Sequence, residues 1–81
     1  MQRTIKVQYF AVLREKRGVS EETVRTTAAT ALALYTELAK KHKFTLDSAL
    51  VRVAVNKEFR EWDAPLQEND QVVFIPPVAG G

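Results

Sequence analysis

The part of this sequence best suited to chemistry is its C-terminal end, which reads Pro76-Pro77-Val78-Ala79-Gly80-Gly81. Glycine has no Cβ, so a Gly-Gly end is thin enough to enter a narrow channel. Proline cannot continue a helix or donate to a sheet ladder, so we expect regular structure to end at Ile75. The tail would then present the carboxylate of Gly81 to the active site of another protein. The alternative is a loose terminus without a role of its own.

No other residues match a known pattern for catalysis, metal binding or cofactor binding. The chain has no cysteine, and its one histidine, His42, is expected at a helix end rather than as a general base. A transition-metal site would need clustered carboxylates, but the pairs Glu21/Glu22 and Glu68/Asp70 are typical of turns. Glycine-rich phosphate loops and the nucleophile elbow are absent. We therefore expect this chain to bind no metal and no cofactor itself.

The composition is that of a small globular domain. The 81 residues are 46% hydrophobic and 27% charged, with a formal net charge of +2. This charge is too small to predict nucleic-acid binding, and no apolar run is long enough to cross a membrane. The absence of cysteine and of an apolar signal segment fits a cytoplasmic location. We expect one domain over residues 1–75, followed by the tail at residues 76–81.

Two kinds of periodicity predict the elements that hold this tail. Alternating apolar residues predict strands around Ile5, Val53 and Val72, and weaker patterns predict short strands over residues 22–26 and 59–62. Residues 11–17 are expected to form a helical turn that ends at glycine 18. One long helix is predicted from apolar residues at helical spacing, with Thr27 or Thr30 as its cap: Ala28, Ala31, Leu34, Tyr35, Leu38 and Ala39.

The resulting order of elements, β-β-α-β-β-β, predicts an α+β fold. One helix with one apolar face needs one sheet to cover it, and the strand–helix–strand unit needs a right-handed crossover. The order resembles the ubiquitin-like β-grasp, with a mixed sheet of four to five strands packed on one main helix. An extended C-terminal tail would leave this domain at its last strand.

Alternation also predicts which side chains point away from the helix. This outward set is Lys6, Gln8, Phe10, Arg52, Ala54, Val73 and Ile75, with Phe59 assigned to the same face, and several of these side chains are apolar. Apolar groups on a solvated face suggest a docking surface, and Ile75 adjoins the tail. We expect Phe10, Phe59, Ile75 and Arg14 to contact a partner. The alternatives are a loop that covers this face, or scattered surface residues without a role.

Three segments resemble the MoaD family, the small sulfur-carrier subunits of molybdopterin synthase. They are residues 9–18 (YFAVLREKRG), residues 52–56 (RVAVN) and residues 70–81 (DQVVFIPPVAGG). The Pro-Pro-Val-x-Gly-Gly ending is far more specific than Gly-Gly alone. The middle of the chain is similar only in pattern. One departure is Asn69, where the family often has glycine, although asparagine also accepts a left-handed turn.

The resemblance implies a mechanism centred on Gly81. An E1-like adenylating enzyme would activate its carboxylate with ATP and Mg²⁺, and sulfur would then replace AMP to leave a thiocarboxylate. Residues 76–80 would carry this group into the large subunit of molybdopterin synthase, where it donates sulfur to a cyclic pyranopterin precursor. Two charged carriers would be needed for each dithiolene. The catalytic groups would belong to the partners, so the chain would not be an enzyme by itself.

Three other functions stay open from the sequence. The chain could carry sulfur for thiamine or cysteine synthesis, since the tail indicates the charging chemistry rather than the product. It could be a ubiquitin-like modifier that is conjugated to lysines through Gly81. It could also be a β-grasp binding module that uses only its sheet face.

Overall fold

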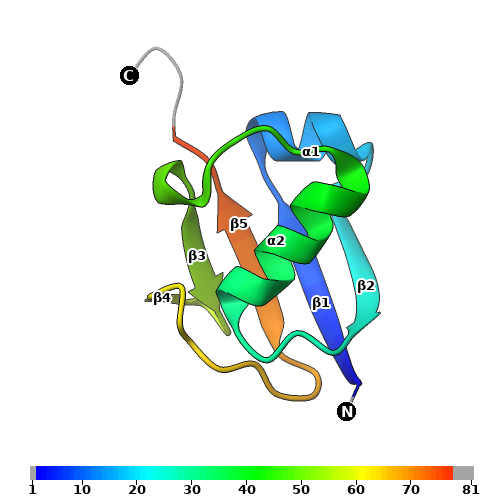
Figure 1. The fold of residues 1–81 in the computed structure, drawn as a ribbon, viewed down its shortest axis with the longest axis vertical. Coiled ribbons are helices and arrows are strands. Elements are labelled where there is room, and N and C mark those ends of the chain that lie inside the picture. Colours follow the sequence, from blue (N-terminus) through cyan, green and yellow to red (C-terminus); the bar gives the residue numbers. More distant parts are fainter. Residues whose placement is uncertain (1, 78–81) are drawn as a thin grey trace.

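A mixed sheet forms the centre of the computed structural model, which describes residues 2–77 (Figure 1). Within these residues the sheet has five strands in the order β2-β1-β5-β3-β4. The elements are β1 (Arg3–Tyr9), α1 (Ala11–Arg17), β2 (Glu21–Thr26), α2 (Ala31–His42), the 3-10 helix η1 (Ser48–Leu50), β3 (Arg52–Val55), β4 (Glu58–Arg60) and β5 (Gln71–Ile75). The predicted α+β architecture, one main helix across one face of a mixed sheet, is confirmed.

The two central strands, β1 and β5, are parallel. β1 also pairs antiparallel with β2, whereas β5 pairs antiparallel with β3, which in turn pairs with β4. Parallel neighbours need a long crossover, and the chain between β1 and β5 supplies it, including α2. Tyr9 lies opposite Phe74, so the C-terminal ends of both strands lie at the same end of the sheet.

Helix α2 begins where Thr30 caps it, the second of the two caps considered from the sequence. The Thr30 hydroxyl accepts a hydrogen bond from the backbone N–H of Ala33, at 3.2 Å. Ala28 was predicted to lie on the apolar face of the helix. It is buried, but it precedes the helix, which begins at Ala31. The helix ends at His42, and the next residue, Lys43, caps it: its backbone is left-handed and its N–H donates to the carbonyl of Ala39. The buried face of α2 was predicted correctly: Ala31, Leu34, Tyr35 and Leu38.

Aromatic rings fill the space between α2 and the sheet. Tyr35 lies 5.2 Å from the ring of Phe74 on β5 and 5.3 Å from that of Trp62, centroid to centroid. The Tyr35 hydroxyl donates to the carbonyl of Leu46, and the Trp62 indole N–H donates to the carbonyl of Ser48. Both polar ends are therefore satisfied inside an apolar core, which is the usual condition for burying these side chains.

The last hairpin differs from the prediction in its strand bounds. Asn56 and Lys57 form a tight turn with positive φ values of 52° and 71°, and this turn pairs Val55 with Glu58. β4 therefore covers Glu58–Arg60 rather than residues 59–62. The predicted extension to Trp62 was wrong because that side chain leaves the sheet edge to pack in the core.

Gly18 provides a test of the backbone at the end of α1. It has a φ of 88° and donates its N–H to the carbonyl of Arg14, and an added Cβ would meet no atom within 4 Å. We expect Gly18→Ala to reduce the free energy of unfolding by about 1 kcal/mol because of the left-handed backbone. Gly18→Asn should lose less, since asparagine tolerates this region. Urea denaturation would measure both, and equal losses would contradict this explanation.

Candidate functional site

The root of the C-terminal tail lies beside helix α1. Because β1 and β5 are parallel, their C-terminal ends lie at the same end of the sheet (Figure 1). Phe10 follows the end of β1, and Ile75 is the last residue of β5. Pro76 is buried and Pro77 is exposed. The predicted end of regular structure at Ile75 agrees with the end of β5. The other predicted tail residues, Val78, Ala79, Gly80 and Gly81, lie outside the described residues.

An apolar groove of about 540 Å³ opens between this root and α1, and we call it the tail-root groove. Its lining residues are Phe10, Ala11, Val12, Glu15, Ile75, Pro76 and Pro77. Phe10 is 40% exposed and Val12 is 46% exposed, although both are large and apolar. An exposed apolar surface of this kind is typical of a contact with another protein.

The outward face of the sheet extends this apolar surface toward β4. Phe59 is 61% exposed, and it is paired with Ala54, which is paired in turn with Val73 on β5. The guanidinium of Arg52 lies 4.7 Å from the centre of the Phe59 ring, a cation–π arrangement that holds the ring against the sheet. Ala54 was predicted to point outward, and its register agrees, yet it is only 8% exposed because it lies between its neighbours Phe59 and Val73.

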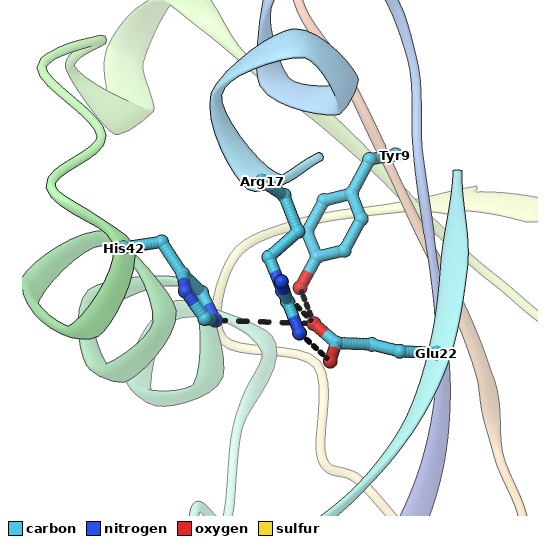
Figure 2. Close-up of polar contacts among 4 residues, drawn as sticks. All are labelled: Tyr9, Arg17, Glu22 and His42. Atoms are coloured by element: carbon cyan, nitrogen blue, oxygen red, sulfur yellow. Dashed lines mark hydrogen bonds and ion pairs between the residues drawn. The ribbon is translucent and has the colours of Figure 1, made fainter. Parts of the chain in front are cut away.

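A polar cluster lies on the other side of α1, and we call it the Glu22 cluster (Figure 2). The Tyr9 hydroxyl donates to Glu22 Oε2 at 2.6 Å, and Arg17 donates to both carboxylate oxygens, at 2.9 and 2.8 Å. His42 Nε2 lies 3.9 Å from Oε2. Four elements therefore meet at one carboxylate: β1, α1, β2 and α2.

The pKa values in this cluster follow from its contacts. The Arg17 hydrogen bonds hold the pKa of Glu22 below its ordinary value of 4.5. Burial raises the pKa of the Tyr9 hydroxyl, so Tyr9 stays a donor. Burial also lowers the pKa of His42 below 6.5, and the charge of Arg17 acts in the same direction. The cluster is thus ionised at Glu22 and Arg17 near neutral pH.

Comparison with known proteins gives the groove and the face their context. A family model described as the ThiS family matches residues 7–81. The chain belongs to the ThiS family. It is 35% identical over 80 residues to the molybdopterin synthase sulfur carrier subunit of Escherichia coli, which covers 95% of this chain and 99% of the relative. The resemblance to the MoaD family is therefore confirmed.

Solved structures show the same fold. A putative molybdopterin converting factor, subunit 1, from Pyrococcus furiosus is 35% identical, with a TM-score of 0.78 over 94% of this chain and 99% of that one. One chain from a complex of subunits 1 and 2 of molybdopterin-converting factor from Helicobacter pylori is 23% identical, with a TM-score of 0.63. The match covers 100% of this chain and 100% of that chain. Small archaeal modifier proteins share the fold at identities below 25%. The fold alone does not separate these functions.

The predicted contact residues of this ThiS-family chain fall in three places. Phe10 and Ile75 come together in the tail-root groove, and Phe59 lies on the same sheet face but on the far strand β4. Arg14 is exposed on α1 and does not line the groove, where Glu15 lies instead. Val12 also lines the groove and was missed in the sequence analysis. Whether these residues bind a partner stays a prediction.

The Glu22 cluster corrects one prediction about a charged residue. Arg17 donates to the carboxylate of Glu22 through two of its guanidinium nitrogens. Glu22 was considered typical of a turn, but it lies in β2 and points toward α1. His42 ends α2 as expected.

Within residues 2–77, no group of three potential metal ligands is present, and no helix is long and apolar enough to cross a membrane.

The Glu22 cluster predicts that acid destabilises the fold in two steps. The pKa of His42 is lower in the folded protein, so protonation favours the unfolded state as the pH falls through about 6.5. The pKa of Glu22 is also lowered, so its contribution is complete above pH 4.5 and is lost below it. Thermal melting against pH should show that His42→Gln removes the first step and Glu22→Gln reduces the second. An unchanged pH profile in both variants would contradict this origin.

Proposed function

We infer that this chain is the sulfur carrier of a molybdopterin synthase. The observation that carries this conclusion is the 35% identity, over nearly the full length of both chains, to a relative named as that carrier subunit. The Pro-Pro-Val-Ala-Gly-Gly ending supports it, because it places a side-chain-free carboxylate at Gly81. A cytoplasmic location belongs to the same proposal, since charging consumes ATP.

The chemistry takes place at the carboxylate of Gly81. An E1-like partner transfers AMP from ATP, with Mg²⁺, to one carboxylate oxygen, and pyrophosphate leaves. A carboxylate is a poor electrophile, whereas the acyl-adenylate is a good one. A sulfur nucleophile at the oxidation level of sulfide then attacks the carbonyl carbon and AMP leaves. The resulting thiocarboxylate is the nucleophile that carries sulfur to the next reaction.

The second half of the cycle takes place in the large subunit of the synthase. The thiocarboxylate sulfur attacks a carbon of the cyclic pyranopterin precursor and displaces an oxygen leaving group, so that a thioester joins carrier and precursor. Water then hydrolyses the thioester, which leaves the sulfur on the precursor and returns Gly81 to a carboxylate. Two charged carriers supply the two sulfur atoms of one dithiolene. The acids, bases and phosphate-binding groups of this scheme belong to the partners, so this chain contributes the reactive end and its placement.

The tail-root groove and the outward sheet face are the proposed docking surface. Phe10, Val12 and Phe59 are large apolar side chains that are at least 40% exposed. Burial of such residues is a main source of affinity between proteins. The groove adjoins Pro76 and Pro77, so a partner bound there also holds the start of the tail. The tail would then enter the partner from a defined position.

The alternative functions differ in what becomes attached to Gly81. A carrier for thiamine or cysteine synthesis would be charged with sulfur but would not support the synthase reaction. A ubiquitin-like modifier would form isopeptide bonds with lysines and appear as a ladder of conjugates in cell extract. A pure binding module would keep its activity after deletion of Gly80 and Gly81.

Charging can be tested directly by intact-mass measurement. After co-expression with the E1-like enzyme encoded in the same genome, we expect the mass change of one oxygen replaced by sulfur, at Gly81. Fragmentation should localise the change, and a chain without Gly80 and Gly81 should stay unmodified. An unchanged mass in the full chain under charging conditions would refute the sulfur-carrier function.

Docking can be tested with two charged substitutions on the proposed surface. Phe59→Lys and Ile75→Lys should each weaken binding to the large subunit by about tenfold or more, which corresponds to about 1.4 kcal/mol. Phe59 is 61% exposed, so the domain should stay folded, as circular dichroism would show. Leu32→Lys is the matched control, because Leu32 is 42% exposed on α2. Unchanged affinity in Phe59→Lys and Ile75→Lys would rule out this face.

A further inference from the structure

Glu22 contacts both ends of the segment that forms one wall of the tail-root groove. Tyr9 directly precedes Phe10, and Arg17 is the last residue of α1. Both donate to the same carboxylate, Tyr9 through its hydroxyl and Arg17 through two guanidinium nitrogens. Figure 2 shows the Tyr9 hydroxyl and the Arg17 guanidinium meeting at the Glu22 carboxylate. Between these two points lie Phe10, Ala11 and Val12, which line the groove.

This segment has little else to hold it in place. Helix α1 has seven residues, and its one buried residue is Leu13. A helix this short is not stable by itself in water. Its first turn has no side-chain cap, and Ala11 is held at a φ of 52°, which is unfavourable for a residue with a Cβ. The position of α1 therefore depends on the burial of Leu13 and on contacts at its ends.

The interaction is well suited to fixing a position. The Arg17 guanidinium meets the carboxylate with two nitrogens, and this paired geometry restrains orientation as well as distance. Tyr9 is only 1% exposed, so the surrounding core holds its side chain and hydroxyl in place. Arg17 and Glu22 are themselves only 28% and 18% exposed, which limits competition from water.

We propose that Glu22 is a positioning residue for docking: by binding Tyr9 and Arg17 together, it holds residues 10–12 in the conformation that a partner recognises. This proposal rests on the proposed function, because it assumes that the tail-root groove is a docking surface. Glu22 lies on the opposite side of α1 from the partner and acts through Phe10 and Val12. A purely structural role would instead lower stability without a specific effect on docking.

Hydrogen exchange of the free protein tests the positioning without a partner. In Glu22→Gln, which loses the charge but keeps the shape, exchange over residues 10–18 should become about tenfold faster. Arg17→Lys keeps the charge but loses the paired geometry, so it should act in the same direction with a smaller effect. Thr26→Val is the matched control, because it removes two hydrogen bonds at the opposite end of β2. It should leave exchange over residues 10–18 unchanged.

Binding to the large synthase subunit of the same organism tests the consequence. Glu22→Gln should weaken binding about fivefold, but less than twofold when Phe10 is already alanine, because the two residues then act through one contact. Thr26→Val should bind normally below its melting temperature. Full additivity of Glu22→Gln and Phe10→Ala, or unchanged exchange over residues 10–18, would overturn the proposal. If Phe10→Ala alone binds normally, the docking surface is wrong, and the exchange data still decide whether Glu22 positions the segment.

Discussion

The parallel pairing of β1 and β5 is the constraint on which the rest of the site depends. It brings the C-terminal ends of two strands that are far apart in sequence to the same end of the sheet. One end continues into the tail and the other into α1, so the groove between them is a consequence of the topology. A shift of this register by one residue would turn every side chain of one strand to the other face. The core and the docking surface would then be lost together.

β5 serves both faces of the sheet at once. Val72 and Phe74 point into the core, whereas Val73 and Ile75 face outward and are half-buried. An apolar run of this kind is typical of a strand that is covered on both sides. Only one side of β5 is covered by α2, so the outward pair lies on the proposed docking surface. The strand that leads into the tail is thus also the strand that links the core to that surface.

Local sequence patterns predicted the helices and strands, but they could not predict contacts between elements that are distant in the sequence. Alternation and helical spacing are properties of neighbouring residues, so the inward residues of β1 and β5 and the buried face of α2 could be found from the sequence. The Glu22 cluster could not, because its four members come from four elements and share no spacing. The end of β4 was missed for a related reason: the core packing of Trp62 overrides the weak strand pattern around it. Gly81 stays a prediction, because it lies outside the described residues and rests on the lack of other reactive groups and on the family resemblance.

The exposed apolar face could promote aggregation, and the short strand β4 limits this risk. Phe59 lies on the outermost strand, whose free edge could pair with the edge of another sheet and begin aggregation. β4 is only three residues long, and charged residues stand on both sides of Phe59, at Glu58 and Arg60. A short, charged edge gives poor backbone pairing to a second copy while leaving the ring available. Self-association through this edge is therefore disfavoured, which the proposed function of a carrier that moves between proteins would require.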